Sequence, residues 1–426
     1  MPNVREYAFE CLSHIFIDKS YSNIDLDNTI RSAKLSEKDR ALLTNIVYGT
    51  LQHSNILKWE INLHNTSRKK LDRKMEVLLM LSLYQMRYLT KIPSYAILNE
   101  AVEIAKKIDG IYGSKFCNGV LRTLQREPKV PKISDFKDVY GYYQTIYNHP
   151  IWLIKMWETH YGKETTFKIL EENLKEPPLT VRLDTNKYSK EELLKNPDFI
   201  EANLCENAFY YVGKESLWEK EESKKGYITV QDESSQNVSI ILDPQENDNI
   251  LDMCAAPGSK TVHIASLMNN TGKILAIDVH PHRVELINKS LKHHNLTNVM
   301  TKCYDSTILS TKIRHNYFDR ILLDAPCSGF GVIRRKPDIL LDMSPEKLDD
   351  IIALQEKLLE NAYALLKVNG TLVYSTCTMS KKENENQIIK FISKHKDMKK
   401  VYEKQIFPFD YNSDGFYIAK LVKVGE

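Results

Sequence analysis

Short apolar runs that alternate with amphipathic segments dominate the chain from about Gly226 onward. The runs are NILDMCA, KILAIDV, VMTKCYD, RILLDAP, GTLVYSTC and FYIAKLVKV. Strands interleaved with helices in this way are typical of a doubly wound α/β sheet. Such sheets bind ligands beyond the carboxyl ends of their strands. The sequence therefore predicts an α/β domain over residues 226–426, with its functional residues directly after the apolar runs.

The preceding residues divide into two further regions. Residues 1–128 carry apolar positions at intervals of three and four, as in MEVLLMLSLYQMRYL, and predict a helical bundle in which Pro93 separates two helical patterns. Pro128 and Pro131 then indicate a linker. The segment YNHPIWLIKMWETHYG opens a new helix, and LTVRLDT and AFYYVG read as short strands. We therefore expect residues 129–225 to form a linker and a small α+β region.

The composition of the 426-residue chain limits the class of protein to which it can belong. A hydrophobic fraction of 42% can fill proper cores, and no stretch approaches the ~20 apolar residues that span a bilayer. The N-terminal residues lack the pattern of a signal peptide, so we expect a soluble cytoplasmic protein. Seven scattered cysteines without CxxC pairs suggest neither a zinc site nor a disulfide framework.

Several local basic segments leave room for a polyanionic partner, although the net charge of +3 does not require one. A solvated charged face explains each segment at least as well. The segments consist of Arg68, Lys69 and Lys70; Arg73 and Lys74; and Arg334, Arg335 and Lys336.

The first apolar run ends in a turn of small residues, LDMCAAPGSKT, that leads into a helix. Ala255, Ala256 and Gly258 allow the backbone to approach a ligand, which the first amides of the helix then face. The turn is neither GxGxxG nor a phosphate loop, because it has one glycine and lacks the required spacing. It is a weak nucleotide motif when it is taken alone.

An acidic residue ends each of three successive runs: Asp278, Asp305 and Asp324. Asp278 lies about 20 residues beyond Gly258, a position that suits a grip on ribose hydroxyls. The alternative for each acid is a cap on the following helix or turn, but three in succession favour a shared ligand. A cationic, adenosine-bearing cofactor suits this acidic rim better than NADP, whose extra phosphate prefers arginine.

Two cysteines also follow apolar runs. Cys327 lies in LLDAPCSGFG and Cys377 in LVYSTCTMS, both beside the expected cofactor site. Carbon 5 of a pyrimidine is too poor a nucleophile to accept a methyl group unaided. Addition of a thiolate to carbon 6 makes carbon 5 nucleophilic, and removal of the carbon 5 proton then allows elimination of the thiolate. Most single cysteines are inert, and we interpret Cys254 as lining of the cofactor loop.

The segments DMCAAPGSKT, LLDAPCSGFGVIRRKPD and YSTCTMSKKENENQ resemble the RNA 5-methylcytosine methyltransferases. Upstream, QDESSQ resembles the same group, and AILNEAVEIAKKIDGIYGSKFCNGVLR resembles the helical domain of the antitermination factor NusB. The combination is similar to the bacterial 16S rRNA (cytosine-5) methyltransferase RsmB/Sun family over nearly the whole chain. The resemblance implies a Rossmann-like S-adenosylmethionine-dependent methyltransferase sheet over residues 226–426. It also implies a NusB-like RNA-binding domain over residues 1–128 and an RNA-recognition region over 129–225.

The resemblance also implies the roles of individual residues. Cys377 would be the nucleophile, Cys327 would assist release of the methylated product, and Lys260 and Asp324 would lie close to the target base. One departure is Ser259, where the family more often has glycine; serine fits unless that position needs a positive φ. The implied contacts of the cofactor S-adenosyl-L-methionine are Cys254, Ala255, Ala256, Pro257, Gly258, Ser259, Lys260, Asp278, Asp305 and Asp324.

The implied partner is 16S rRNA that is unassembled or partly assembled, with the target cytosine exposed or flipped. The helical domain, together with Arg334, Arg335 and Lys336, would contact phosphates. We expect a monomer, with neither DNA nor a membrane as partner. The alternatives are a catalytically silent RNA-binding assembly factor and a methyltransferase for another RNA such as tRNA. A methyltransferase for small molecules or proteins would need neither two placed cysteines nor the helical domain.

Overall fold

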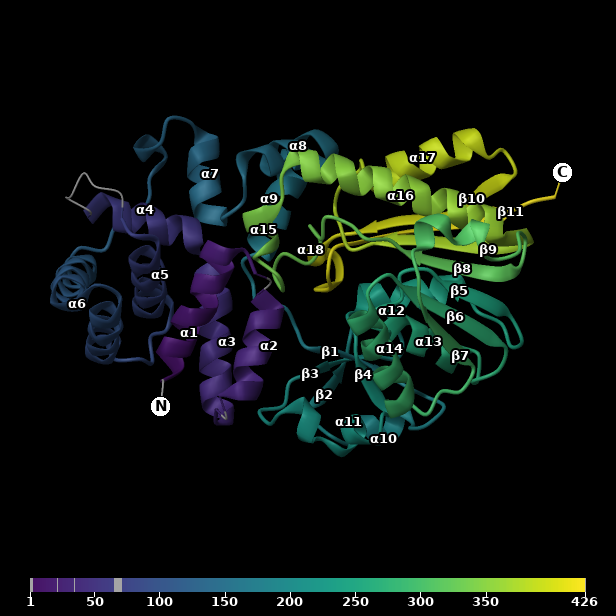
Figure 1. The fold of residues 1–426 in the computed structure, drawn as a ribbon, viewed down its shortest axis with the longest axis horizontal. Helices are drawn as coiled ribbons and strands as arrows, with labels where there is room; N and C mark the ends of the chain where they lie inside the picture. The colour runs from purple at the N-terminus through teal and green to yellow at the C-terminus, as the bar shows by residue number, and fades with distance from the viewer. Residues whose placement is uncertain (1–2, 21, 34, 65–70, 426) are drawn as a thin grey trace. The chain divides into compact units, whose positions relative to one another are not determined.

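The computed structural model describes residues 3–20, 22–33, 35–64 and 71–425 (Figure 1). Its contacts divide the chain into two compact units, Met1–Lys175 with Ile333–Met343, and Glu176–Val332 with Ser344–Glu426. The basic residues Arg68, Lys69 and Lys70 lie outside the described residues. Within the described ranges, no helix is both long and apolar enough to cross a membrane.

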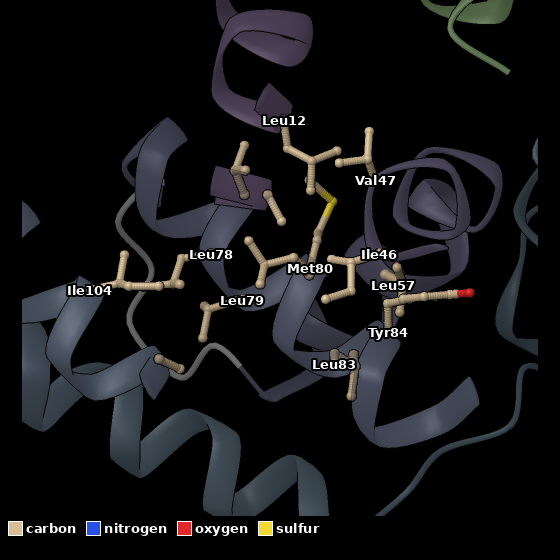
Figure 2. Packing of buried hydrophobic residues seen from close by; sticks show 14 of the residues in the cluster. Leu12, Ile46, Val47, Leu57, Leu78, Leu79, Met80, Leu83, Tyr84 and Ile104 are labelled. Atoms are coloured by element: carbon tan, nitrogen blue, oxygen red, sulfur yellow. The ribbon is translucent and has the colours of Figure 1, made fainter. Parts of the chain in front are cut away.

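The first unit is helical, as predicted for residues 1–128, and is built around α5 (Arg73–Tyr88). This helix is buried without a break from Val77 to Gln85, because its apolar residues are not confined to one stripe. Figure 2 shows its side chains among those of the neighbouring helices. Those helices are α1 (Val4–Ser13), η1 (His14–Asp18), α2 (Ser22–Ser32), α3 (Glu37–Gln52), α4 (Ser54–His64) and α6 (Ser94–Arg126), which is kinked at Asp109 and Gly110.

Three further helices, from residues 129–175, belong to the same unit. After a short turn η2 (Ile133–Asp135) they are α7 (Val139–Tyr147), α8 (Ile151–Tyr161) and α9 (Lys163–Glu172). Asn148, which follows α7, accepts a hydrogen bond from the Ser54 hydroxyl at 3.0 Å and donates one to the carbonyl of Leu51 at 2.9 Å. The contacts therefore divide the chain after Lys175, and the three-domain division at residues 128 and 225 stays a prediction.

A distant segment, Ile333–Met343, also belongs to the first unit and contains the short helix α15 (Ile339–Asp342). The carboxylate of Asp338 accepts hydrogen bonds from the Ser22 hydroxyl at 2.6 Å and from the Ser22 amide at 3.2 Å. Ser22 itself is fully buried. The segment is thus held by the first residue of α2.

The second unit begins with a small antiparallel sheet, which includes the two segments LTVRLDT and AFYYVG that the sequence predicts to be strands. Its order is β2 (Phe199–Glu201), β3 (Ala208–Tyr211), β1 (Thr180–Leu183) and β4 (Ile228–Val230). Leu183, Phe199 and Phe209 lie in its core. Short helices lie between the strands in sequence: α10 (Lys190–Leu194), η3 (Leu217–Glu219) and α11 (Glu221–Lys224).

Among the described residues, a second sheet holds seven strands in the order β10-β11-β9-β8-β5-β6-β7. The strands from β9 to β7 in this order are parallel, and β11 and β10 add an antiparallel hairpin. The chain runs outward from β5 to β7 and then returns to β8, so the topological switch point lies between β5 and β8. The strands are β5 (Asn249–Asp252), β6 (Lys273–Asp278), β7 (Val299–Cys303), β8 (Phe318–Asp324), β9 (Leu366–Thr376), β10 (Met398–Ile406) and β11 (Phe416–Lys423).

Helices cover both faces of this sheet (Figure 1), which confirms the doubly wound α/β prediction. Successive residues of β8 face opposite layers, since Leu323 packs in the cluster of α16 and α17 while Leu322 packs in that of α12 and α13. The helices are α12 (Glu233–Leu242), α13 (Ser259–Leu267) and α14 (Pro281–His293) on one face, and α16 (Pro345–Leu365) and α17 (Glu385–Lys394) on the other, with η4 (Ser306–Thr311) and α18 (Pro408–Tyr411) in connections.

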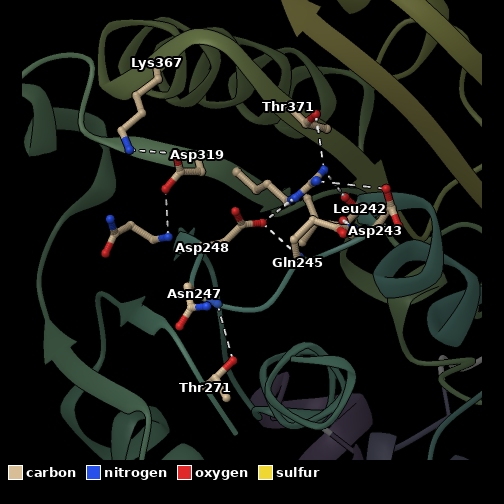
Figure 3. Close-up of polar contacts among 11 residues, drawn as sticks. Leu242, Asp243, Gln245, Asn247, Asp248, Thr271, Asp319, Lys367 and Thr371 are labelled. Atoms are coloured by element: carbon tan, nitrogen blue, oxygen red, sulfur yellow. Dashed lines mark hydrogen bonds and ion pairs between the residues drawn. The ribbon is translucent and has the colours of Figure 1, made fainter. Parts of the chain in front are cut away.

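Charged residues link the strands at the amino-terminal edge of the sheet (Figure 3). The guanidinium Nε of Arg320 donates to the Asp248 carboxylate at 2.6 Å, and its Nη1 donates to the carbonyl of Leu242 at 2.9 Å. Nearby, the carboxylate of Asp319 accepts from Lys367 at 2.6 Å. These contacts lie at the edge opposite the strand ends where ligands bind, so we assign them a structural role.

Candidate active site

The loop after β5 combines a close turn with the start of a helix. Gly258 has φ +105° and precedes the first residue of α13. A Cβ at this position would lie 3.2 Å from the Cα of Ile287 on α14, so glycine is needed both for its backbone conformation and for the close approach of the helices. Ser259 is the first residue of α13 and is not in the positive-φ region, so the departure from the family pattern is accommodated.

Two acids near this loop already have protein partners. The buried carboxylate of Asp278 accepts from the His280 amide at 3.1 Å and lies 3.3 Å from the Arg283 guanidinium. Asp305 is exposed and caps η4, accepting from the Thr307 amide at 2.8 Å and the Thr307 hydroxyl at 2.7 Å. The alternative interpretation of Asp305 as a cap therefore holds, and its role toward a cofactor stays a prediction.

Arg283 was not singled out from the sequence. Its Nη2 donates to the carbonyl of Ala256 at 3.2 Å, while its Nη1 faces Asp278. The side chain therefore joins the loop after β5 to the end of β6. A basic residue in the first turn of a helix gives no distinctive sequence signal, because surface helices commonly carry charged residues on their outer face.

Asp252 at the end of β5 is a buried acid close to the same loop. The Thr261 hydroxyl donates to its carboxylate at 2.7 Å. Burial raises the pKa of Asp252 to about 7, and the carboxylate of Asp324 adds to this effect. Asp252 was also not predicted from the sequence, although it lies within the first apolar run and ends β5.

Lys260 and Asp324 form an ion pair at the switch point of the sheet. Their Nζ and Oδ2 atoms are 2.7 Å apart, and only 12% of the lysine side chain is exposed. The other carboxylate oxygen of Asp324 accepts from the Ser375 hydroxyl at 2.7 Å. Burial alone would lower the pKa of Lys260, but Asp324 outweighs it and the pKa is raised. The lysine therefore carries its charge within the site.

The structure brings the two predicted cysteines together. Cys327 follows the end of β8 and Cys377 directly follows β9, and these strands are parallel neighbours. Their Sγ atoms lie 3.2 Å apart, and both side chains are half-buried. The amide of Gly331 donates to the carbonyl of Cys377 at 2.9 Å, which ties the two loops together.

The two thiols have different electrostatic surroundings. The hydrogen bond with Cys377 and burial raise the pKa of Cys327 well above its ordinary value, and the Glu383 charge adds to them. The charge of Cys377, in turn, is one of the contributions that raise the pKa of Lys260. The lysine cation therefore favours an ionised Cys377, whereas the acid Glu383 disfavours an ionised Cys327.

Cys254, the third cysteine near the site, differs from this pair. Burial raises the pKa of Cys254 well above its ordinary value, which agrees with loop lining rather than reactivity.

The basic segment after the Cys327 loop is only partly accessible. Arg334 is only 5% exposed, so the expectation that it contacts phosphates is wrong: its side chain is packed within the protein. Lys336 is exposed.

Comparisons with known proteins agree with this arrangement. Residues 239–422 match the family described as 16S rRNA methyltransferase RsmB/F, residues 2–126 the NusB family, and residues 149–197 the ferredoxin-like domain of RsmF/B-like methyltransferases. A probable ribosomal RNA small subunit methyltransferase B from Bacillus subtilis is 39% identical, with 99% of each chain covered.

Solved structures are similar to the chain as well. The crystal structure of PH0851 has a TM-score of 0.83 at 23% identity, covering 97% of this chain and 98% of that one, and shows the fold. NSun6 from Pyrococcus horikoshii, determined with SFG, an analogue of S-adenosylmethionine, has a TM-score of 0.59 at 25% identity. That match covers 65% of this chain and 99% of the other.

The switch-point sheet, its glycine turn and its acidic strand ends define a class, the S-adenosylmethionine-dependent methyltransferases. Full-length similarity narrows this class further. The chain belongs to the RsmB/F family of 16S rRNA methyltransferases, and a NusB domain precedes its methyltransferase domain.

Proposed function

We propose that the protein methylates carbon 5 of a specific cytosine in 16S rRNA through a covalent bond between Cys377 and the base. The observation that carries the proposal is the pair of thiols 3.2 Å apart at neighbouring strand ends. Methylation of an amine or hydroxyl needs no covalent enzyme intermediate and hence no such pair. Carbon 5 of cytosine, by contrast, becomes nucleophilic only after a thiolate has added to carbon 6.

In the proposed reaction the Cys377 thiolate forms a bond to carbon 6, and the ring electrons move toward carbon 5. S-adenosylmethionine supplies the electrophilic methyl group that carbon 5 accepts. A base then removes the proton from carbon 5, the bond between sulfur and carbon 6 breaks, and the thiolate leaves. Lys260 stabilises the Cys377 thiolate before it adds and after it leaves.

We assign the release step to Cys327. Its raised pKa keeps the Cys327 thiol protonated beforehand, so it does not compete with Cys377 for carbon 6, and its Sγ atom, 3.2 Å from that of Cys377, lies close enough to the bound base to assist elimination. The electrostatic difference between the two thiols supports this division of roles, because Lys260 favours charge on Cys377 and Glu383 opposes charge on Cys327. Asp324 holds Lys260 in place.

The residues around the glycine turn fit the cofactor. Asp278, Asp305 and Asp324 supply negative charge at successive strand ends, which suits a sulfonium cation and ribose hydroxyls. Gly258 allows the turn to pack closely against α14, and the turn leads into the first amides of α13, which can face a ligand. We therefore propose that S-adenosylmethionine is held by the loop Cys254, Ala255, Ala256, Pro257, Gly258, Ser259 and Lys260, together with these three acids.

We further propose that the substrate is 16S rRNA before its subunit is complete. We also propose that the enzyme works in the cytoplasm and as a monomer. A paired cytosine is inaccessible to an attacking thiolate, so the base must be unpaired or flipped. The helical residues 1–128 and the region 129–225 would bind the flanking RNA. Exposed basic residues such as Lys74 and Lys336 would then make its affinity depend on salt.

Replacement of Cys377 by alanine tests the proposal. We expect Cys377→Ala to reduce methyl transfer to the background level, because carbon 5 is then never activated. Binding of S-adenosylmethionine, measured by calorimetry, should stay within about twofold of normal. Cys303→Ala, which removes an exposed thiol at the end of β7, is the matched control. Near-normal turnover by Cys377→Ala would rule out the covalent route.

A further inference from the structure

One buried carboxylate joins the two cysteine loops. Glu383 is fully buried, and its Oε1 accepts from the Ser328 amide at 2.8 Å while its Oε2 accepts from the Ser328 hydroxyl at 2.7 Å. Ser328 is the residue after Cys327. The hydroxyl of Thr378, the residue after Cys377, lies 3.4 Å from Oε2 and 2.6 Å from the Ser328 hydroxyl.

A third element completes the connection from the other side of Cys327. The side-chain amide of Gln355 on α16 donates to the carbonyl of Pro326 at 3.0 Å and to Glu383 at 3.3 Å. Gln387 on α17 donates in turn to Gln355 at 3.2 Å. Ser328 is therefore bonded to the Glu383 carboxylate directly, and Pro326 is connected to it through Gln355.

These contacts come from neutral groups, namely one backbone amide, two hydroxyls and one side-chain amide. Burial raises the pKa of Glu383, because a buried carboxylate loses its hydration and the hydrogen bonds from Ser328 and Gln355 offset this loss only in part. Well-packed apolar side chains would fill a buried space at lower cost. An acid with this hydrogen-bond pattern is therefore better explained by what it holds than by the stability it adds.

We propose that Glu383 is a positioning residue that fixes the loops of Cys327 and Cys377 in register, so that both thiols face one base. The inference rests on the proposed function, because register matters for catalysis only if both thiols act on the same cytosine. A misplacement of about 1 Å in a reacting group can lower a rate about 100-fold. Glu383 acts through the two loops and not on the base itself.

Two substitutions distinguish a hydrogen-bonding role of Glu383 from a need for its negative charge. In Glu383→Gln, the amide oxygen can still accept from the Ser328 amide, and the NH₂ group can donate to both hydroxyls. In Glu383→Met, all of these bonds are lost at similar volume. We expect kcat to fall on the order of 100-fold for Glu383→Met and less than about 10-fold for Glu383→Gln, with the KM for RNA unchanged in both.

A second readout is independent of methyl transfer. Diamide, a diazene oxidant, takes two protons and two electrons from a pair of thiols, becomes a hydrazine and leaves a disulfide. The rate at which it couples Cys327 to Cys377 therefore reports their register. We expect this rate, followed by mass spectrometry of the linked peptides, to fall about 10-fold or more in Glu383→Met and to recover in Glu383→Gln. Because the assay needs no RNA, it is informative even if the proposed substrate is wrong.

Controls exclude a simple loss of folding. Glu385→Gln changes a partly buried acid two residues away and should alter neither rate. If Glu383→Met does not fold, Ser328→Ala and Thr378→Val weaken the same bridge from either loop and should slow disulfide coupling. Equal loss of kcat in the Gln and Met variants would overturn the proposal in favour of a need for charge. Unchanged coupling in folded Glu383→Met or in both loop variants would overturn it as well.

Discussion

At the scale of single residues, the site depends on what surrounds each acid. Asp324 has the cationic Lys260 as its partner at 2.7 Å, whereas Asp252 lies buried one strand away and is driven toward its neutral form. Burial is the main cause of the raised pKa of Asp252, and the hydrogen bond from Thr261 and the charge of Lys260 offset it only in part. The charge of Lys260 also acts on Cys377.

The raised pKa of Asp252 predicts how stability depends on pH. Between the pKa of an unfolded aspartate, about 3.9, and the folded value of about 7, the folded state binds more protons, so stability falls as pH rises. In Asp252→Asn this loss disappears. We expect the Tm of the wild type, relative to the variant, to decrease across this range and to level off above it. A Tm difference independent of pH would contradict the assignment.

Part of the site follows from the sequence at this scale, and part does not. Cys327, Cys377 and Asp324 could be picked out because they stand at or just after the ends of apolar runs, and in a parallel sheet such positions meet at one edge. Lys260 was implied only by the family resemblance. Glu383 could not, because the run KKENENQ has the composition of a solvated surface. Its burial results from the convergence of α16, α17 and two loops, which no local pattern encodes.

At the scale of elements, the two edges of the sheet have different roles. The carboxyl ends of β5, β6, β8 and β9 carry the candidate active site. The amino-terminal edge carries the ion pair of Arg320 with Asp248 and that of Lys367 with Asp319, the latter labelled in Figure 3. Substitutions at the latter edge should therefore affect stability without affecting the chemistry.

Arg320→Met tests this separation. The side chain of Arg320 is 16% exposed and its loss leaves Asp248, itself 17% exposed, without its ion-pair partner. We expect a cost of about 2–3 kcal/mol in the free energy of unfolding, with kcat unchanged at temperatures where the protein is folded. Lys367→Met breaks the more exposed pair with Asp319 and should cost less than about 1 kcal/mol. Equal effects of the two changes in denaturant titrations would contradict this interpretation.

The parallel strands could be predicted from the sequence, but β10 could not. Its segment MKKVYEKQI lies at the edge of the sheet, and several of its side chains are exposed. Edge strands commonly carry charged side chains, which weaken the alternation that marks a strand.

The kink of α6 at Asp109 and Gly110 also lacks a decisive signal in the sequence, because an isolated glycine is tolerated within a helix.

At the scale of the whole molecule, the chain does not divide into units in the order of its sequence. Residues 333–343 leave the second unit after the Cys327 loop and pack as part of the first, where Asp338 accepts two hydrogen bonds from Ser22. The pattern VIRRKPDIL suggests an exposed basic loop. The structure instead buries Arg334, because contacts distant in sequence hold the segment.

Asp338→Ala should release this segment. Loss of two hydrogen bonds to a carboxylate costs about 1.5–3 kcal/mol, enough to raise the open population at least about 10-fold. We therefore expect trypsin to cleave after Arg334 or Arg335 at least about 10-fold faster, as followed by mass spectrometry. Asp350→Ala, a change at an exposed acid on α16, serves as the control. Cleavage at the wild-type rate would show that other contacts hold the segment.

A covalent bond between Cys377 and a cytosine of 16S rRNA is the central claim. The most direct measurement incubates Cys327→Ala with unmodified 16S rRNA and methyl-labelled S-adenosylmethionine, then separates the products on a denaturing gel. We expect a labelled band at the mass of protein plus RNA, because release fails after methyl transfer, and its loss when Cys377 is also replaced. Absence of the adduct, although the wild-type enzyme labels the RNA, would contradict the covalent mechanism, and unlabelled RNA after treatment with the wild-type enzyme would contradict the proposed substrate.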